Sequence, residues 1–316
     1  MTQAVLTQTP TGELRQLIGR LTARRPFTRR HLQIVLGLLW LLDGALQAQP
    51  FMFTRAFGTQ LIAGTGAGQP TVVRWPVHFS STVIAGHPFA WNLLFAAIQV
   101  LIGVGLLLRR TARTTLIVSV VWALGVWYLG EGLSGLASGH ASIINGAPGS
   151  ALLYAVLAVA AFPGGRLRET PARWLMWAWA ALWVGAAVYQ VLPGQNTGSD
   201  TAGVVTGGAA GGPHWLVQLD TSIGTWMTHN GVLTVVGLAV VYVLIGLGAL
   251  VRATRTWSLT VGLVLAIAIW ITGQDLGQLY SGQATDPNSA PLIVLMAVAA
   301  WATVGQAVRR TGARTS

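Results

Sequence analysis

Residues 101–145 read LIGVGLLLRRTARTTLIVSVVWALGVWYLGEGLSGLASGHASIIN, and residues 244–288 read LIGLGALVRATRTWSLTVGLVLAIAIWITGQDLGQLYSGQATDPN. At this offset of 143 positions, 19 of the 45 residues are identical without a gap. Apolar bias alone would match many Leu and Val, but it does not account for the identical Arg, Trp, Gly and Asn. The pattern therefore predicts that one structural unit occurs twice in the chain.

The repeat extends beyond this stretch in both directions. The same offset pairs Trp40 with Trp183, and a four-residue deletion after Pro291 aligns AVLAVAAF with VLMAVAAW. The chain thus divides into four parts: a basic segment at residues 1–30, a first four-helix unit at 31–165, a second at 172–308 and a basic tail at 309–316. Because each unit has an even number of helices, both should have the same orientation in a membrane, as in parallel-repeat membrane proteins.

The composition is that of a membrane protein. Hydrophobic residues make up 53% of the chain and charged residues only 9%, whereas a soluble domain carries about a quarter charged residues. Apolar segments near the length of a membrane span lie at about 31–49, 88–108, 114–130, 148–164, 172–192, 230–251, 257–273 and 290–308. The sequence therefore predicts an all-α polytopic bundle of about eight transmembrane helices.

Charge is distributed unevenly along the chain. All 19 Lys and Arg residues are Arg. The predicted spans put 17 of them on one side of the membrane, and only Arg55 and Arg74 on the other. The positive-inside rule then puts both termini in the cytoplasm and the protein in a bacterial inner membrane. Residues 1–30 are predicted to form a basic amphipathic helix on the lipid surface. Since the Arg residues cluster beside apolar segments, a nucleic-acid partner is not expected.

The order of one span, an outside amphipathic segment and three further spans resembles the DoxX-like family of four-helix membrane proteins. The stretches GLLWLLDGALQ, at residues 37–47, and QVLIGVGLLLRRTAR, at residues 99–113, are similar to the first and second helices of that family. The resemblance implies an association with quinone- or thiol-linked redox systems. The acid that the family often carries at the position of Gln99 is absent, and Tyr242 occupies that position in the second unit. No catalytic residue therefore carries over.

The candidate polar site combines an intramembrane residue with residues at the outer ends of two spans. Asp43 lies about twelve positions into the first span, where an ionisable group is costly and a functional candidate. Its expected partners are Gln47, one turn along the same face, and Gln99 on the second span. The repeat aligns Glu131 with Gln274 and Gly132 with Asp275, so each unit has an acid at the outer end of its third span. Two interpretations remain for this set of polar residues. They could line an outward-facing vestibule, or they could serve only in helix packing and as helix termini in contact with water. The set is Asp43, Gln47, Gln99, Glu131, Gln274 and Asp275.

Metal and cofactor chemistry has few candidate residues. The chain has no Cys, which excludes Cys-ligated iron–sulfur clusters and disulfides. No pair of His faces another across a bilayer, so haem is not expected either. His78, His87 and His140 lie on the outer side without the close spacing of a metal site, and no metal is predicted there. A quinone is the cofactor class that the family resemblance leaves open.

Three classes of function remain. The first is a non-catalytic accessory or assembly subunit of a redox or envelope system, with a protein partner in the membrane. The second is a transporter for a small solute with a site between the two repeats. The third is a membrane enzyme that acts on a lipid or quinone at the outer face. The scarcity of catalytic groups favours the first class, and no nucleotide-binding or hydrolase motif occurs in the sequence.

Overall fold

The computed structural model describes residues 27–163, 171–209 and 211–312, with side chains as far as residue 303. Every regular element in these residues is a helix, and no strand occurs among them. The predicted all-α class is therefore confirmed. The predicted basic helix at residues 1–30 falls almost wholly outside the described residues.

The two predicted units have a similar order of helices. The first half contains α2 (Arg29–Leu46), η1 (Pro50–Phe53), η2 (Phe57–Ile62), α3 (Thr71–Gly86), α4 (Pro88–Leu107), α5 (Ala112–Leu129), η3 (Gly132–Ser138), η4 (Ile143–Asn145) and α6 (Ser150–Ala160). The second half contains α7 (Leu175–Gln190), α8 (Gly198–Gly207), α9 (His214–His229), α10 (Gly231–Gly248), α11 (Arg255–Ile271), η5 (Asp275–Gln278) and α12 (Ser289–Gly312).

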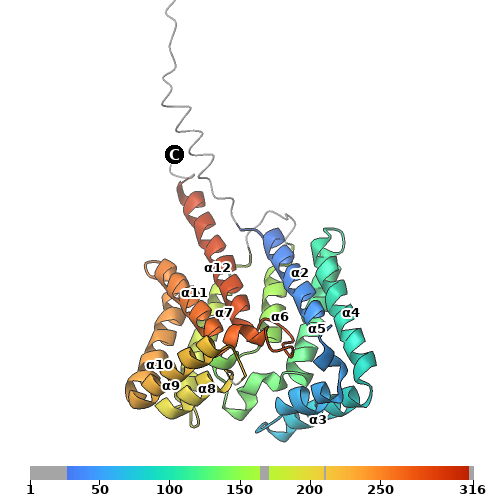
Figure 1. The fold of residues 1–316 in the computed structure, drawn as a ribbon. Helices are drawn as coiled ribbons and strands as arrows, with labels where there is room; N and C mark the ends of the chain where they lie inside the picture. Colours follow the sequence, from blue (N-terminus) through green and yellow to red (C-terminus); the bar gives the residue numbers. More distant parts are fainter. Residues whose placement is uncertain (1–26, 164–170, 210, 313–316) are drawn as a thin grey trace, which may run out of the picture.

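The same helices pair with one another in both halves. In the first half α2 packs on α4, α5 on α6, and η2 on α3; in the second, α7 packs on α10, α11 on α12, and α8 on α9. The two halves lie side by side in Figure 1, and α6 contacts α12 where they meet. This arrangement brings the ends of α5 and α11 to the same end of the molecule.

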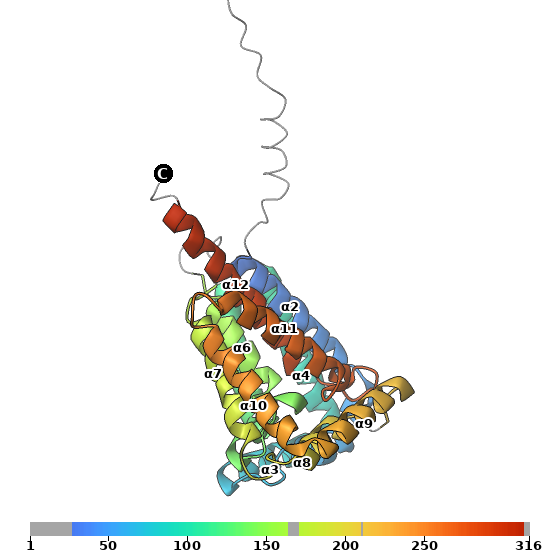
Figure 2. The ribbon, with the colours of Figure 1, turned by 90° about the vertical axis from the view of Figure 1, so that its left-hand side faces the viewer.

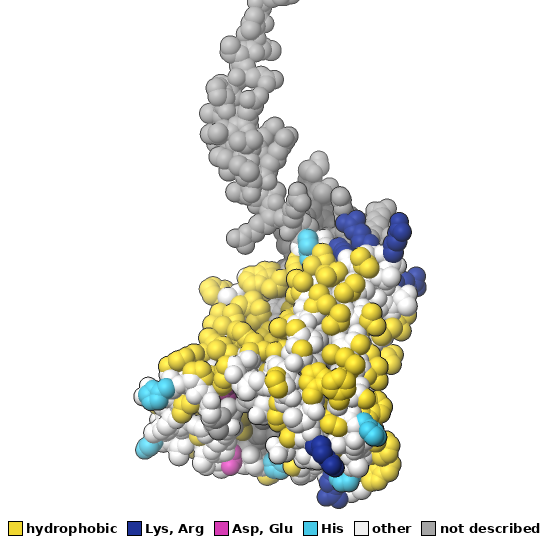
Figure 3. Space-filling model, turned by 45° about the vertical axis from the view of Figure 1, so that its right-hand side comes forward, with side chains coloured by type: hydrophobic (Ala, Val, Ile, Leu, Met, Phe, Trp, Pro, Cys, Tyr) yellow, Lys and Arg dark blue, Asp and Glu magenta, His cyan; other side chains and the backbone are white. Residues whose placement is uncertain are grey.

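The helices fall into two groups by direction. Figures 1 and 2 show α3, α8 and α9 lying across one end of the molecule, while the remaining α-helices run from there toward the opposite end. Figure 3 shows hydrophobic side chains over the middle of one face, with Arg side chains gathered near its two ends. Many large apolar side chains are exposed on the long helices, such as Val121 (68%) and Val232 (81%). An apolar exterior of this size is typical of a surface that faces lipid.

Three helices among the described residues are long and apolar enough to cross a membrane: α4, α5 and α10. These confirm three of the eight predicted spans in length and composition. Two of the other apolar helices fall short in length, since α6 has 11 residues and α11 has 17. The helix α2 has 18 residues but includes Arg29, Arg30 and Asp43.

Both halves build the turn at the end opposite α3, α8 and α9 in the same way. The Thr111 hydroxyl donates a hydrogen bond of 2.8 Å to the Gly105 carbonyl, which closes the α4–α5 turn. The Thr254 hydroxyl donates one of 2.9 Å to the Gly248 carbonyl in the α10–α11 turn. Each bond satisfies a carbonyl that the end of the helix leaves without a backbone partner.

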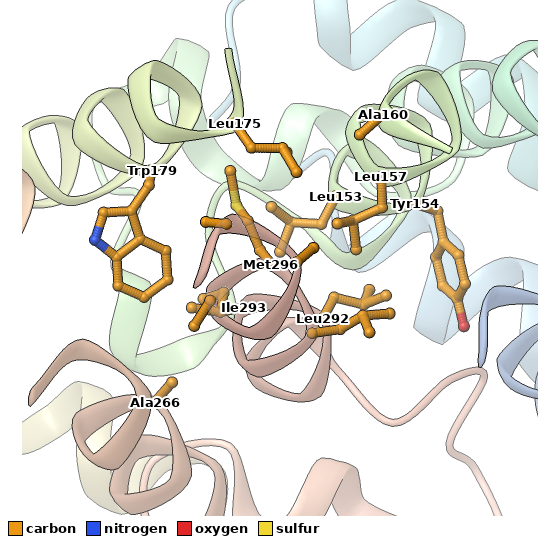
Figure 4. Packing of buried hydrophobic residues seen from close by; sticks show 14 of the residues in the cluster. Leu153, Tyr154, Leu157, Ala160, Leu175, Trp179, Ala266, Leu292, Ile293 and Met296 are labelled. Atoms are coloured by element: carbon orange, nitrogen blue, oxygen red, sulfur yellow. The ribbon is translucent and has the colours of Figure 1, made fainter. Parts of the chain in front are cut away.

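Glycine and alanine allow close helix packing. A Cβ on Gly103 of α4 would lie 2.9 Å from the Gly37 carbonyl oxygen of α2, and one on Gly246 of α10 would lie 3.0 Å from the Ala180 carbonyl oxygen of α7. Figure 4 shows the centre of the core, where Leu292, Ile293 and Met296 of α12 pack near side chains of α6 and α7. Small residues at helix contacts favour van der Waals packing in membranes, where the hydrophobic effect contributes little between helices.

Candidate functional site

A cavity of about 860 Å³ lies where the two halves meet, at the end of the molecule that carries α8. Its walls come from the segment after α5, the start of α6, one side of α8 and the segment between α11 and α12. The polar and ionisable residues that line it include Gln69, Glu131, His140, Asn145, Asp200, Gln274, Gln278, Asp286 and Asn288. Volumes of about 300–1,000 Å³ are usual for sites that bind small molecules.

The backbone after α5 and α11 turns back sharply to form the cavity walls. Leu133 and Leu276, which occupy matching positions of the repeat, both have left-handed backbone angles, with φ of 55° and 56°. This conformation costs about 1–2 kcal/mol for a residue with a Cβ. Gly139 and Gly282, also matching, have φ of 80° and 74°, where glycine carries no such cost. The repeated glycine-rich sequence thus encodes a turn that the two halves share.

Glu131 joins the cavity to the start of α6. One carboxylate oxygen accepts hydrogen bonds from the Ser150 hydroxyl (2.8 Å) and the Ala151 backbone N–H (3.0 Å), and the other accepts one from Ser134 (3.0 Å). Burial, and then the negative charge of Asp286, raise the pKa of Glu131 to about 7, although these hydrogen bonds favour the charged form. Glu131 can therefore gain or lose a proton near neutral pH.

Gln274 occupies the equivalent place in the second half. Its side-chain oxygen accepts a hydrogen bond of 3.1 Å from the Ala290 N–H at the start of α12, and its amide donates to the Ser289 hydroxyl (3.0 Å) and the Ile143 carbonyl (3.2 Å). Both Glu131 and Gln274 line the cavity. The two halves thus bind the start of their last helix in the same way, with a carboxylate in one and a neutral amide in the other.

Asp275 does not line the cavity. It is fully buried, and its carboxyl group interacts directly with that of Asp220 on α9, which is also fully buried. Burial and the neighbouring carboxyl group raise the pKa of Asp220 to about 7, and burial raises the pKa of Asp275 as well. Asp220 was not among the residues predicted from the sequence. The sequence indicates only that it is one of several acids on the outer side, which does not distinguish it from the others.

Asp43, Gln47 and Gln99 do not line the cavity either, although Asp43 lies within electrostatic range of Asp286 and Glu131. Asp43 is buried in α2, and its Oδ1 has no hydrogen-bond donor within the described residues. The expected hydrogen bonds from Gln47 or Gln99 are not formed. Gln47 instead accepts a bond of 2.7 Å at its backbone carbonyl from the Asn92 side chain of α4. The six predicted polar residues therefore divide among the cavity, a buried carboxyl pair and the interior of the first half.

The three histidines that sequence reasoning weighed as metal ligands are in different places. His140 lines the cavity, and its backbone carbonyl accepts a hydrogen bond of 2.9 Å from Gln195. His78 lies on α3, and His87 precedes α4. The described part of the chain has no group of three or more His, Asp or Glu side chains arranged to hold a metal ion.

The cavity is electrically negative. Sequence reasoning did not include Asp200 or Asp286 in the candidate site, yet both line the cavity together with Glu131. The carboxylate of Asp286 accepts hydrogen bonds from Thr285 (2.9 Å) and from the Asn288 N–H (2.8 Å). No Arg is among the described residues of its lining, where His140 is the one basic side chain. The cavity is therefore suited to a positively charged ligand.

No protein-family model, curated protein or solved structure matches this chain.

Proposed function

We propose that this chain is a multi-pass membrane protein that binds a small, positively charged solute in the cavity between its two halves. The observation that carries this proposal is the cavity of about 860 Å³, lined by the carboxylates of Glu131, Asp200 and Asp286 without an opposing Arg among its described residues. Clefts with charges of one sign attract ligands of the other sign and raise their local concentration.

The proposed setting is a bacterial inner membrane, with both termini in the cytoplasm and the cavity on the outer side. Support comes from α4, α5 and α10, which are long and apolar enough to cross a membrane. The Arg residues support this orientation, because Arg30, Arg109 and Arg252 lie at the end of the molecule opposite α3, α8 and α9. In this arrangement the exposed Trp75 of α3 and Trp226 of α9 lie at the outer membrane interface, where Trp is enriched.

The proposed architecture is a tandem duplication of a DoxX-like four-helix unit. The matching helix pairs of the two halves and the matching Thr–Gly turns support it. An accessory role in a redox or envelope system remains a prediction from that resemblance, and a membrane enzyme remains the third alternative. Because the cavity brings together the carboxyl groups of Glu131, Asp200 and Asp286, solute binding takes precedence over both, and transport is the activity that such a site would serve.

Ligand binding by the purified, full-length protein in detergent tests the proposal. The probes are choline, putrescine and tetramethylammonium, with acetate and phosphate as anions, measured by thermal shift and calorimetry at pH 8. We expect cations alone to raise the melting temperature. Glu131→Gln and Asp286→Asn should each weaken cation binding by about tenfold, as expected for the loss of about 1.4 kcal/mol.

A matched control removes a carboxylate that lies outside the cavity. Asp43→Asn should change the affinity for the same cation less than Glu131→Gln or Asp286→Asn does, because Asp43 does not line the cavity, although it lies within electrostatic range of Asp286 and Glu131. Two results would reject the proposal: preferential binding of the anions, or no binding of any cation by protein that remains folded and monodisperse.

A further inference from the structure

Two buried carboxyl groups, those of Asp220 and Asp275, interact directly behind the wall of the cavity. Asp220 lies in the middle of α9, and Asp275 begins η5. Both are 0% exposed, and none of their four carboxyl oxygens has a hydrogen-bond donor among the described residues. Buried polar atoms are nearly always partnered in folded proteins, so this pair calls for a ligand that the protein atoms do not supply.

Electrostatics limits what that ligand can be. Two adjacent carboxylates repel each other strongly in a buried site, and one of them holds a proton as a result. The helices α8 and α9 and the segment 275–288 contain no Arg. A proton between the two groups supplies both the missing donor and the missing positive charge.

We infer that Asp220 and Asp275 form a proton-binding site, in which the two carboxyl groups share one proton at neutral pH.

The surroundings of the pair are shaped to hold a carboxyl group. A Cβ on Gly208, just after α8, would overlap with Oδ2 of Asp275, so glycine at this position leaves room for the carboxyl group where it lies. In the first half the small residue is on the other side of the corresponding contact. Gly132 stands where the second half has Asp275, Thr65 stands where it has Gly208, and a Cβ on Gly132 would overlap with the Thr65 carbonyl oxygen. Aligning Trp75 with Trp215 puts Ser80 opposite Asp220, and Ser80 donates a hydrogen bond to the Leu129 carbonyl. The carboxyl pair is therefore specific to the second half.

The titratable groups on the neighbouring elements do not neutralise the pair. Tyr280 lies within electrostatic range of both aspartates, and burial and then their charges raise its pKa. His214 and His229 are exposed at the two ends of α9. Of the helices packed against these elements, α8 carries Asp200, which lines the cavity, α10 carries Tyr242, and α11 carries Arg255 at its opposite end.

The site adjoins the cavity. Gly208 and Gln278 both line it, and the Gln278 amide donates a hydrogen bond of 3.0 Å to the Gly208 carbonyl. Loss of the shared proton adds one negative charge immediately behind this wall. If the cavity binds cations as proposed above, their affinity should rise with pH in the wild type and rise less in Asp275→Asn. This consequence rests on the proposed function, whereas the proton site does not.

Infrared spectroscopy of the full-length protein tests the proton site without any solute. Wild-type protein labelled with ¹³C-aspartate is titrated from pH 5 to pH 9, so that aspartate carboxyl bands are separated from those of Glu131. We expect a protonated aspartate band that disappears near pH 7. Asp220→Asn and Asp275→Asn should each abolish the pH 7 transition, and the remaining aspartate should titrate at least about one pH unit lower.

Asp200→Asn is the matched control, because Asp200 lines the cavity and is not part of the pair; its spectrum should keep the transition. The labelled wild type makes the test independent of whether the variants fold. If no aspartate band titrates between pH 6 and pH 8 in the wild type, or if the band survives in both pair variants, the inference is wrong. Absence of cation binding with this band present would reject the proposed function alone.

Discussion

The ends of α5 and α11 show how far the two halves agree and where they differ. The Trp127 indole N–H donates to the Pro148 carbonyl at 2.8 Å, and that of Trp270 donates to the Pro287 carbonyl at 2.9 Å. Immediately after these matched contacts, the first half has Glu131 and Gly132, and the second has Gln274 and Asp275.

The difference lies in the position of the carboxyl group. In the first half it faces the cavity and binds the start of α6; in the second, one residue later, it is buried against Asp220. The helix pairs and the Trp–Pro contacts are the same in both halves, while the ionisable groups are not. If the halves arose by duplication, they kept their packing and diverged where protons and charges can be bound.

The largest expected effect comes from closing the space that the second half keeps for its carboxyl group. Gly208→Ala introduces, at a half-buried position of the cavity wall, a Cβ that overlaps with Oδ2 of the buried Asp275. We expect a loss of about 1–3 kcal/mol of stability, the usual range for overpacking. Thermal unfolding in detergent, calibrated by chemical denaturation, measures it.

Gly203→Ala, on α8, is the matched control, because a Cβ there would meet no atom within 4 Å. It should be neutral or stabilising by up to about 1 kcal/mol, since alanine favours helix more than glycine. Asp275→Gly, which installs the residue of the first half, should remove most of the cost of Gly208→Ala. If Gly208→Ala costs the same stability in the wild type and in Asp275→Gly, the side chains at positions 208 and 275 do not interact.

The second effect concerns pH. Since the pKa of Glu131 is raised from 4.5 to about 7, the native state holds this proton more tightly than the unfolded state. Its stabilising contribution is therefore full below about pH 4.5 and is lost as the pH rises to about 7. Glu131→Gln keeps an acceptor for Ser150 and Ala151 but has no proton to lose. It should therefore lose this pH-dependent part of the free energy of unfolding, which we expect to be about 1–2 kcal/mol after allowance for solvent screening.

Melting temperatures measured from pH 4.5 to pH 8 check this prediction. Asp220 titrates in the same pH range and also makes stability fall as the pH rises. Glu131→Gln should therefore reduce the slope of melting temperature against pH, and Glu131→Gln/Asp220→Asn should reduce this slope further. Gln274→Glu should add a slope, because its carboxylate would face the Ile143 carbonyl that the Gln274 amide now contacts. A slope unchanged in Glu131→Gln would contradict the assigned pKa.

A smaller effect is expected at Asp43, which aligns with Ala186 in the second half. Because Asp43 Oδ1 has no donor among the described residues, Asp43→Asn should not lower stability by more than about 0.5 kcal/mol. Thermal unfolding and a growth phenotype are measured together. A large loss of melting temperature would show that Asp43 locks helix packing, whereas lost function with an unchanged melting temperature would make Asp43 a functional residue.

The sequence predicted the helical class, because its hydrophobic runs are long. It also singled out Glu131 and Gln274 as candidates, because the repeat aligns them at the outer ends of two predicted spans, and the structure places both in the lining of the cavity. The sequence could not predict the Asp220–Asp275 contact. Asp220 and Asp275 are 55 positions apart, and their contact depends on how the α8–α9 pair lies against the segment after α11, which no local pattern specifies. The hydrogen bonds expected between Asp43 and Gln47 failed for a similar reason: helical spacing puts side chains on one face without fixing their rotamers.

A further predicted effect isolates a single hydrogen bond that one half has and the other lacks. In the first half the Trp40 indole N–H donates a bond of 3.0 Å to the Ser119 hydroxyl. In the second half the matching Trp183 N–H has no partner within the described residues, and Gly262 occupies the position of Ser119. Serine would not fit there, because a Cβ on Gly262 would overlap with the Trp179 ring.

Trp40→Phe removes both ring volume and the hydrogen bond, whereas Trp183→Phe removes ring volume alone. Trp40→Phe should therefore cost more stability, by about 0.6 kcal/mol and at most roughly 2 kcal/mol, the range for hydrogen bonds between membrane helices. A double-mutant cycle of Trp40→Phe with Ser119→Ala should give a coupling of the same size, which separates the bond from the packing of each ring. If the cycle gives no coupling, the Trp40–Ser119 bond contributes nothing to the difference between the halves. The excess cost of Trp40→Phe would then come from the Tyr154 ring, whose centroid lies 4.4 Å from that of Trp40.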